Sequence, residues 1–400
     1  MHPKIKILYV FHTSIIGGGS FCLLNIVKSL DKDLYTPIVL LRNDGPLVSE
    51  LKKNGAEVFF EKSIATVPYN KSLFSILSII QWLGVMCSMP KILRFLKKSN
   101  IHIIHLNTMM MYPYLFLSAY LKIKSVIHIR ENWPKSEHIF QLNLARKVIQ
   151  SKADKIVAIN QTSAGVIDFS KKTTVVYDTI DFANREDKFE FSEVFGDDYL
   201  KLKIFVFFGG FNPQKGTLQV VETFRSAING DDLRLLIVGA ELADFSKLSI
   251  KNVLKRVFSF FNHYTYSDKV MRSIACDSRI KVIPSSYHIL SIIKQSYGVL
   301  SFFTIPHANL LLAESICLEK PVIAAATSEA YEYSNGGEAA LLYDMLDTKD
   351  FERKINYLLN NYDQNLVNKI KKGANVLVKQ FDRRRNANLL HQVYTNLLEI

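Results

Sequence analysis

The sequence predicts an α/β protein with two parallel-sheet domains in series. Short apolar segments alternate with segments of helical spacing, first over residues 1–160 and again from residue 203 onward. This alternation is typical of parallel sheets that helices cover on both faces. A chain of 400 residues with 48% hydrophobic and 22% charged residues is long and apolar enough to form two such cores.

The predicted strands follow one another in two series. The first series comprises "KIKILYVF", "YTPIVLL", "AEVFF", "IHIIHLN", "SVIHIR" and "KIVAIN". The second comprises "KIFVFFGGF", "LRLLIVGA", "IKVIPS", "YGVLSFF" and "KPVIAAA". Helical spacing separates them, for example in "SFCLLNIVKSL" and "YPYLFLSAYLKI". A polar, acidic stretch divides the two series, so we expect a first domain at 1–180, a link at 181–200 and a second domain from 201 to 380.

Three glycines, Gly17 to Gly19, lie between the first predicted strand and the first predicted helix. Glycine lets a ligand approach the backbone, and a helix N-terminus attracts anions. The loop therefore binds a phosphate or a polar substrate, or it is only a tight turn. The G-x-G-x-x-G fingerprint of dinucleotide sites does not fit, because its third glycine is replaced by Cys22.

Charge and cysteine content limit the partners and the compartment. The formal net charge of +13 favours an acidic partner, which is a nucleic acid, an anionic lipid surface or a phosphorylated small molecule. The four cysteines are isolated, so neither a zinc site nor a disulfide framework is indicated. No cleavage site of a signal peptide follows the first apolar segment, and we expect a cytoplasmic protein with reduced thiols.

Two segments each leave two interpretations open. Residues 71–98 are apolar and then basic, so they form core helices or present a face to the inner leaflet of a membrane. On the second interpretation, Lys91, Arg94, Lys97 and Lys98 lie near the lipid headgroups. Residues 241–280 form a basic segment with many aromatic residues, which is an extra solvated helix or a second contact with a membrane or polyanion.

The second domain contains the clearer set of candidate site residues. In "FFGGFNPQKGTLQVVETF", a strand and a glycine turn precede Lys215, which can reach a diphosphate from a helix start. In "SFFTIPHANLLLAESICLEKPVIAAA", a helix begins near residue 308, and the amides of Asn309 and Leu310 are free to bind a phosphate. Glu314 offers two acceptor oxygens to a pair of ribose hydroxyls.

Taken together, these motifs resemble the GT-B glycosyltransferases of family 4, the glycosyl transferases group 1. The resemblance covers nearly the whole chain. It is carried, in the order of the family, by "GGGSFCLLNIVKSL", "IHIIHLN", "SVIHIREN", "ADKIVAINQTSAGVI", "VVYDTID", "GGFNPQKGTLQVVETF", "LRLLIVGA", "LLLAESICLEKPVIAA" and "NGGEAALLYD". It implies a GT-B fold, with two Rossmann-like domains facing a deep interdomain cleft and a C-terminal helix at 381–400 that crosses back to the first domain.

The resemblance also implies an activity. A sugar, of hexosyl type, is transferred with retention from a nucleotide-sugar to an acceptor hydroxyl, with no metal or other cofactor. Lys215 neutralises the donor diphosphate, Glu314 holds the ribose, and the amides of Asn309 and Leu310 bind a phosphate. Gly18 and Gly19 line the acceptor side of the reacting centre.

Two positions depart from the usual family pattern. Pro306 replaces a glutamate, and Gly210 replaces an arginine. A branch of the family carries Pro-His and a glycine pair at these places, and the chain resembles that branch. His307 is then expected to contact the donor sugar or a phosphate at the catalytic centre, with Gly210 lining the donor site.

The loss of the arginine leaves Lys215 as the one clear cationic ligand of the diphosphate, because Leu310 stands where the branch usually has an arginine. Arg130, next to Glu131 on the acceptor side, is a candidate to supply the missing positive charge from the first domain.

Each candidate also has a purely structural interpretation. Lys215 is a solvated lysine, Glu314 a helix residue with another partner, and His307 a helix-start residue bonded to the backbone. Arg130 and Glu131 form a structural ion pair. His102 and His105, three apart on a strand, face opposite sides, which argues against a shared metal.

We therefore expect a glycosyltransferase at the inner face of the cell membrane, with a lipid-linked or oligosaccharide acceptor from the assembly of a bacterial capsule, O-antigen or exopolysaccharide.

One alternative is a weak or inactive nucleotide-sugar-binding subunit of a transferase assembly, because Pro306 and Gly210 replace charged residues. Another is a nucleotide-sugar epimerase on the same fold; a phosphorylase would need a pyridoxal-binding lysine that is not identified. Nucleic-acid binding is the weakest alternative, since no recognition motif accompanies the charge.

Overall fold

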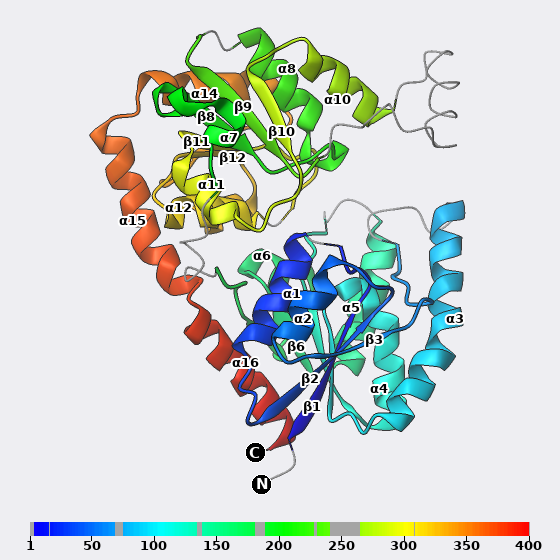
Figure 1. Cartoon of the computed structure of the whole chain (residues 1–400). Helices are drawn as coiled ribbons and strands as arrows, with labels where there is room; N and C mark the ends of the chain where they lie inside the picture. The colour runs from blue at the N-terminus through cyan, green and yellow to red at the C-terminus, as the bar shows by residue number, and fades with distance from the viewer. Residues whose placement is uncertain are drawn as a thin grey trace. The chain divides into compact units, whose positions relative to one another are not determined.

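The computed structural model describes residues 4–15, 17–68, 75–133, 138–180, 189–227, 230–240, 265–307 and 309–399 (Figure 1). The chain forms two compact units. Unit 1 contains Met1–Asp181 and Lys379–Ile400, and unit 2 contains Phe182–Val378. Most of the basic segment at 241–280 lies outside the described residues, including all of 241–264.

Unit 1 is built on a seven-stranded sheet with the order β3-β2-β1-β4-β5-β6-β7, and every pair of neighbours is parallel. The strands are β1 (Ile5–Phe11), β2 (Tyr35–Leu41), β3 (Glu57–Phe60), β4 (Ile103–Leu106), β5 (Lys124–Ile129), β6 (Lys155–Ala158) and β7 (Thr173–Val175). The first six are the segments predicted from the sequence. β7 was missed because its three residues are only half-buried and carry no apolar run.

The helices of unit 1 follow the strands in the expected alternation. They are α1 (Gly18–Ser29), α2 (Pro46–Lys53), α3 (Ile76–Lys98), η1 (Met109–Tyr114), α4 (Leu115–Leu121), α5 (Ile139–Lys152), α6 (Gln161–Val166) and α16 (Arg383–Leu398). Parallel strands require such crossover connections, which is why the sheet is covered by helices rather than joined by hairpins.

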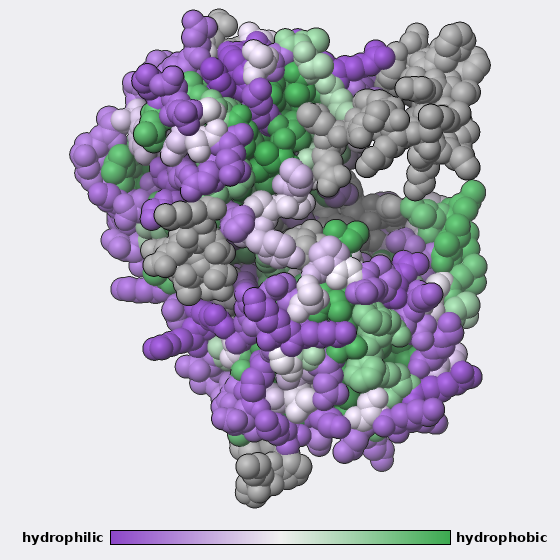
Figure 2. Space-filling view, in the orientation of Figure 1, coloured by the Kyte–Doolittle hydropathy of each residue, from purple (hydrophilic) through white to green (hydrophobic). Residues whose placement is uncertain are grey.

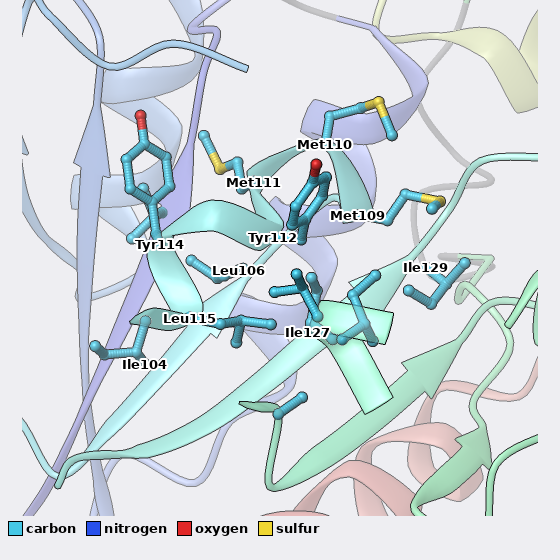
Figure 3. Packing of buried hydrophobic residues seen from close by; sticks show 14 of the residues in the cluster. Ile104, Leu106, Met109, Met110, Met111, Tyr112, Tyr114, Leu115, Ile127 and Ile129 are labelled. Carbon is cyan, nitrogen blue, oxygen red and sulfur yellow. The ribbon is translucent and has the colours of Figure 1, made fainter. Parts of the chain in front are cut away.

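Two apolar clusters pack against the sheet of unit 1. On one side, Met109, Met111 and Tyr112 of η1 lie over β4 and β5, where they meet Ile104 and Ile127 (Figure 3). Methionine is flexible and fills irregular space, which suits the short 3-10 turn that covers these strands. On the other side, α16 inserts Leu390, Val393, Tyr394 and Leu397 into a cluster with residues of β1, β2 and α1.

Unit 2 is built on a six-stranded parallel sheet with the order β10-β9-β8-β11-β12-β13. The strands are β8 (Lys203–Phe207), β9 (Leu233–Val238), β10 (Ile280–Ile283), β11 (Gly298–Ser301), β12 (Val322–Ala325) and β13 (Leu341–Tyr343). The helices are α7 (Ser192–Phe195), η3 (Asp197–Lys201), η4 (Pro213–Lys215), α8 (Thr217–Ala227), α10 (Tyr266–Ala275), α11 (Ile289–Gln295), α12 (Leu310–Cys317), α13 (Ser328–Glu332), α14 (Thr348–Asn360) and α15 (Gln364–Gln380).

The described part of the expected link at 181–200 is folded rather than extended. Residues 189–201 contain α7 and η3, and the Phe191 side chain is fully buried in unit 2. Its ring contacts Phe189, Phe195 and Tyr199 edge to face. This cluster of aromatic residues explains why a polar stretch still packs, because a few rings bury enough apolar surface to anchor it.

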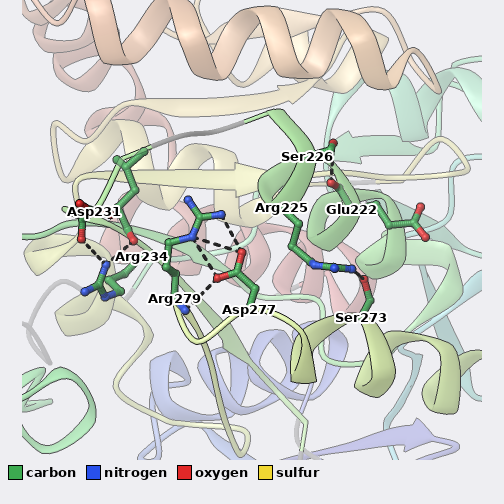
Figure 4. A network of polar contacts seen from close by, with 9 residues as sticks. Glu222, Arg225, Ser226, Asp231, Arg234, Ser273, Asp277 and Arg279 are labelled. Carbon is green, nitrogen blue, oxygen red and sulfur yellow. Dashed lines mark hydrogen bonds and ion pairs between the residues drawn. The ribbon is translucent and has the colours of Figure 1, made fainter.

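Polar contacts support the outer layer of unit 2. Asp277 and Arg279, which lie just before β10, form a two-pronged ion pair with nitrogen–oxygen distances of 2.7 and 3.0 Å (Figure 4). Arg225 of α8 donates to the Ser273 hydroxyl of α10 at 2.9 Å. The Arg225–Ser273 bond ties α8 to α10, and the ion pair orders the loop between α10 and β10. The core of the unit lies beneath them, with Phe205, Phe224 and Phe302 among its largest buried side chains.

Candidate functional site

The candidate donor site lies at the carboxyl edge of the unit 2 sheet. β8 and β11 are neighbours there, so the loops that follow them emerge side by side. The loop after β8 carries Gly209, Gly210 and Lys215, and the loop after β11 carries Phe303 and His307. In open parallel sheets this edge is where ligands bind, because helix N-termini and loops converge on it.

The glycines after β8 are required by the backbone. Gly210 has φ +52°, and a Cβ atom on it would lie 2.4 Å from the carbonyl oxygen of Gly239, which follows β9. The Gly210 amide donates to the Val238 carbonyl at 3.0 Å and holds the two loops together. No side chain fits at this position, so the arginine that the family usually carries here is excluded by the loop geometry of this chain.

Lys215 is held by a locked turn. It ends η4, and Gly216 follows with φ +64°, where an added Cβ would lie 2.2 Å from the Phe302 ring. The buried Thr217 hydroxyl then donates to the Gly210 carbonyl at 2.8 Å. The turn therefore fixes both the glycine loop and the lysine.

The ammonium group of Lys215 lies over an aromatic ring. Its Nζ is 4.1 Å from the centroid of Phe303, a distance typical of a cation–π contact. Burial lowers the pKa of Lys215 to about 8. No salt bridge to Lys215 is found among the described residues. The cation is thus positioned and partly desolvated without a counter-charge.

Phe303 lies between Lys215 and His307 and was not predicted from the sequence. The centroids of the Phe303 and His307 rings are 5.3 Å apart. Desolvation by the surrounding protein, together with the nearby Lys215 ammonium, lowers the pKa of His307. Thr304, next to Phe303, donates its amide to the Gln214 carbonyl at 3.0 Å and ties the two loops together. An aromatic residue just past a strand end was the available signal.

Asn309 and Leu310 mark the start of α12. The helix begins at Leu310, two residues later than expected, with Asn309 as its N-terminal cap. The Asn309 side chain does not cap the helix; its Nδ2 donates to the Ser301 hydroxyl of β11 at 2.9 Å. That bond anchors the helix start to the strand, while the first-turn amides keep the free donors that every helix N-terminus has.

Glu314 lies on α12, one turn past its start. The side chain is half-buried, and burial raises the pKa of its carboxyl group to about 7. No hydrogen bond or ion pair of the carboxyl group is found in the described part of the chain. A carboxylate in this state is available to accept two hydrogen bonds from a ligand.

The glycine loop of unit 1 opens α1, with Gly17 as the cap residue. A Cβ atom on Gly17 or Gly18 would meet nothing within 4 Å, and none of the three glycines has a positive φ. Gly19 is tighter, since its added Cβ would lie 3.3 Å from the Phe11 ring. The fold therefore does not require glycine at positions 17 and 18. Close approach of another molecule to this backbone would require it.

Arg130 and Glu131 do not pair with each other side chain to side chain. The Arg130 guanidinium bonds both carboxylate oxygens of Asp178, at 2.7 and 2.9 Å. The Glu131 carboxylate instead accepts from the Thr108 hydroxyl and from the amides of Met109 and Arg130. Burial raises the pKa of Glu131 despite these donors. Both side chains are thus fully engaged within unit 1.

A buried polar chain runs behind Arg130. Its hydroxyl and imidazole groups belong to Tyr9, Tyr394, His105 and His128, with successive distances of 2.9, 2.7 and 3.3 Å. An Arg130 nitrogen lies 3.5 Å from His128 Nδ1. Since arginine only donates, His128 Nδ1 accepts, and every earlier proton in the chain points toward it. His102 is separate and accepts from the Lys6 amide.

The end of this chain lies beside a cavity. His128 Nε2 is buried and has no hydrogen-bond partner among the described residues. His128 lines a cavity of about 240 Å³ in unit 1, together with residues of α1 and α16. In the described residues, no three His, Cys, Asp or Glu side chains converge as they would to hold a metal ion.

Comparison with known proteins places the fold. Residues 189–376 match the family "Glycosyl transferases group 1". No curated protein matches the chain. Among solved structures, Anabaena Alr3699/HepE in complex with UDP and glucose is 17% identical with a TM-score of 0.73, over 98% of this chain and 99% of that one.

Two further structures are similar over the same extent. A glycosyltransferase from Rickettsia africae is 18% identical with a TM-score of 0.72, over 99% of both chains. Staphylococcus aureus MnaA, in a co-structure with UDP, is 14% identical with a TM-score of 0.67, over 99% of this chain and 98% of that one. The chain therefore has the α/β GT-B fold, and within it residues 189–376 match the glycosyl transferases group 1 family.

Proposed function

We propose that the protein is a glycosyltransferase that takes a sugar from a nucleotide-diphosphate sugar bound by unit 2. The observation that carries the proposal is the pair of unsatisfied charges at one sheet edge. Lys215 and Glu314 are both partly desolvated, and neither has a charged partner among the described residues. Desolvated charge without a partner is costly in a folded protein, so a ligand of matching charge is expected there.

Each residue has a role in this proposal. Lys215 neutralises the diphosphate, which gains negative charge as the sugar leaves, and electrostatic stabilisation of this kind is usually the largest single contribution to catalysis. Glu314 accepts hydrogen bonds from the ribose hydroxyls. The first-turn amides at Asn309 and Leu310 bind a phosphate, and His307, across Phe303 from Lys215, contacts the donor sugar or a phosphate.

The donor to test first is a UDP-sugar. The similar Anabaena protein was solved with UDP and glucose, and the S. aureus protein with UDP. Further parts of the proposal are a retaining, metal-independent hexosyl transfer and a lipid-linked glycan acceptor of a bacterial surface polysaccharide. The open glycine loop at Gly17 and Gly18 supports an acceptor side in unit 1, and the net charge of +13 supports work at an anionic membrane surface.

The alternative of a binding subunit without turnover is supported by a separate observation. The loop geometry leaves no room for a side chain at Gly210, and Pro306 provides no carboxylate. A binding subunit without turnover would need neither group. In that case Lys215 and Glu314 still bind the nucleotide, and only transfer is missing.

The test is thermal stabilisation of the purified chain by UDP, GDP, dTDP, CMP and ADP. A ligand at 100 times its dissociation constant adds about 2.7 kcal/mol to the free energy of unfolding. We expect one diphosphate to stabilise the wild type and to lose its effect in Lys215→Ala and in Glu314→Ala. Lys349→Ala, on the exposed first turn of α14, is the matched control. No response to any nucleotide from folded protein would contradict the donor site, whereas binding without transfer to any glycan acceptor would favour the binding subunit.

A further inference from the structure

The outward face of α3 carries a large apolar surface. Six side chains in its first three turns are between 49% and 79% exposed: Ile76, Leu77, Ile79, Ile80, Leu83 and Met86. Soluble proteins rarely leave so many large apolar side chains together on one helix. Figure 2 shows this surface as a continuous apolar region over the first part of α3.

The apolar region extends onto a second helix. Trp82 of α3 and Leu144 of α5 line the same small groove. At the start of α5, Ile139 is 52% exposed and Phe140 is 71% exposed. Segments about 60 residues apart in the sequence thus contribute to one surface, which we call the α3–α5 surface.

The other side of α3 belongs to the core. Val85, Ile92 and Leu96 are buried in the main apolar cluster of unit 1. α3 is the one helix of the described residues that is long and apolar enough to cross a membrane. A spanning orientation would pull these residues out of the core, so the exposed side alone is free to meet an apolar partner.

Apolar and cationic residues are separated along the axis of this face. Arg94, Lys97 and Lys98 are exposed and follow Ile76, Ile79 and Ile80 by about 18 residues, which is five helical turns. They therefore point the same way. The helix contains no acidic residue. Among its cations, only Lys91 has a carboxylate within 4 Å in the described residues, Glu61 at 3.6 Å.

From these observations we propose that the α3–α5 surface docks on an anionic bilayer, with the exposed side chains of the first three turns of α3 in the acyl region and its basic end at the headgroups. Val85 and the rest of the buried side of α3 stay in the core of unit 1 in this arrangement. Clustered cations next to an apolar surface match anionic headgroups above acyl chains. A second copy of the chain would bring like charges together at this face. The docking surface rests on the proposed function only for its biological purpose, which is to bring the glycosyltransferase to a lipid-linked acceptor.

The test is co-flotation with vesicles of phosphatidylcholine, with and without roughly a third of phosphatidylglycerol. The chain has two tryptophans, Trp82 and Trp133, and both line the groove beside the surface. Lipids brominated in the acyl chains will therefore quench the intrinsic fluorescence if the α3–α5 surface inserts. We expect wild type to float with anionic vesicles and to be quenched.

Variants separate the parts of the surface. Ile80→Glu with Leu83→Glu should weaken vesicle binding at least about tenfold and remove the quenching, because two charges would enter the acyl region. Arg94→Ser with Lys98→Ser should weaken the preference for anionic lipid and the sensitivity to salt, because two of the three cations at the basic end are removed. The matched control is Leu200→Glu, since Leu200 is 82% exposed but lies in unit 2. All five positions are exposed, and an unchanged melting temperature confirms the fold of each variant.

Failure to bind anionic vesicles, or equal binding by the Ile80→Glu, Leu83→Glu variant, would overturn the inference. A change from dimer to monomer in that variant, with vesicle binding unaltered, would assign the surface to a second copy instead. Stabilisation by nucleotides is measured without vesicles, so the two proposals fail separately: loss of nucleotide binding alone counts against the donor site, and loss of vesicle binding alone counts against the surface.

Discussion

The carboxyl edges of the two sheets both carry buried or half-buried charge, but they satisfy it differently. In unit 1, Arg130 is bonded to both oxygens of Asp178, and Glu131 accepts three hydrogen bonds. In unit 2, the described residues give Lys215 an aromatic ring but no carboxylate, and they give Glu314 no partner. The first arrangement is complete without a ligand, and the second is not.

This difference separates charges that hold the fold from charges that await a ligand. Removing one member of a complete buried pair leaves its partner desolvated and unpaired, so stability is lost. Removing an already unpaired group relieves a desolvation cost, so stability is kept and binding is lost. The four predictions below test this distinction, from the largest expected effect to the smallest.

Asp178→Ala should lower the free energy of unfolding by about 3–5 kcal/mol, because it leaves the Arg130 guanidinium buried without its carboxylate. The two side chains are only 9% and 11% exposed. Denaturant titration measures the loss. The matched control is Asp198→Ala, whose ion pair with Lys201 is 82% and 79% exposed and should cost no more than about 1 kcal/mol. Equal costs for the two variants would remove the distinction between the edges.

Lys215→Ala should lower sugar transfer by about 10²–10³-fold, which corresponds to about 2.7–4 kcal/mol of transition-state stabilisation, with the melting temperature retained. The cation has no carboxylate partner, so its loss does not leave a charge unpaired. Steady-state kinetics with a UDP-sugar measure the effect. Near-normal turnover in this variant would count heavily against the proposed role of Lys215.

Mild acid should destabilise unit 1. Burial, aided by Arg130, lowers the pKa of His105 to about 3, and burial holds the pKa of His128 well below 6.5. Below pH 6.5 the unfolded chain takes up protons that the folded chain does not, so stability falls as pH falls. Each histidine contributes about 1.4 kcal/mol per pH unit, or about 2 kcal/mol at pH 5.

Denaturant titrations between pH 7 and pH 5 measure this slope. His105→Asn should reduce the slope of the free energy of unfolding against pH by the contribution of one histidine, whatever the variant does to stability at pH 7. An unchanged slope would mean that His105 is not held neutral in the folded protein.

Nucleotide binding should be strongest between pH 7 and pH 8. The pKa of Glu314 is about 7, and the acceptor form is the carboxylate, so affinity rises as pH passes 7. The pKa of Lys215 is about 8, and the diphosphate needs the ammonium form, so affinity falls above pH 8, by about tenfold at pH 9. Titration calorimetry measures both limbs. Lys215→Arg keeps its charge at high pH and should remove the alkaline limb; a limb that persists in this variant would assign it to another group.

Much of the fold and part of the site could be predicted from the sequence. The α/β class was confirmed. Strand and helix periodicities are local properties of the sequence, so each segment can be recognised on its own. Lys215 and Glu314 were recognisable because each stands in a short motif next to a predicted strand. Phe303 was missed, since its position just past a strand end does not by itself distinguish an aromatic residue that lies under a lysine from one that fills a core. Asp178 was missed as well, since it is 48 residues from the arginine it binds.

What the sequence by itself determined is therefore the set of elements and the residue types at their ends. Hydrophobic period and glycine placement are properties of neighbouring residues, and these suffice for strands, helices and loops. The tertiary structure alone decided which charges are satisfied. It brings the Gly239 carbonyl against Gly210, so that no side chain fits, and it joins His105 to Tyr394 across 289 residues. It also decided which side of α3 faces the core, because burial depends on what packs against a helix and not on the helix itself.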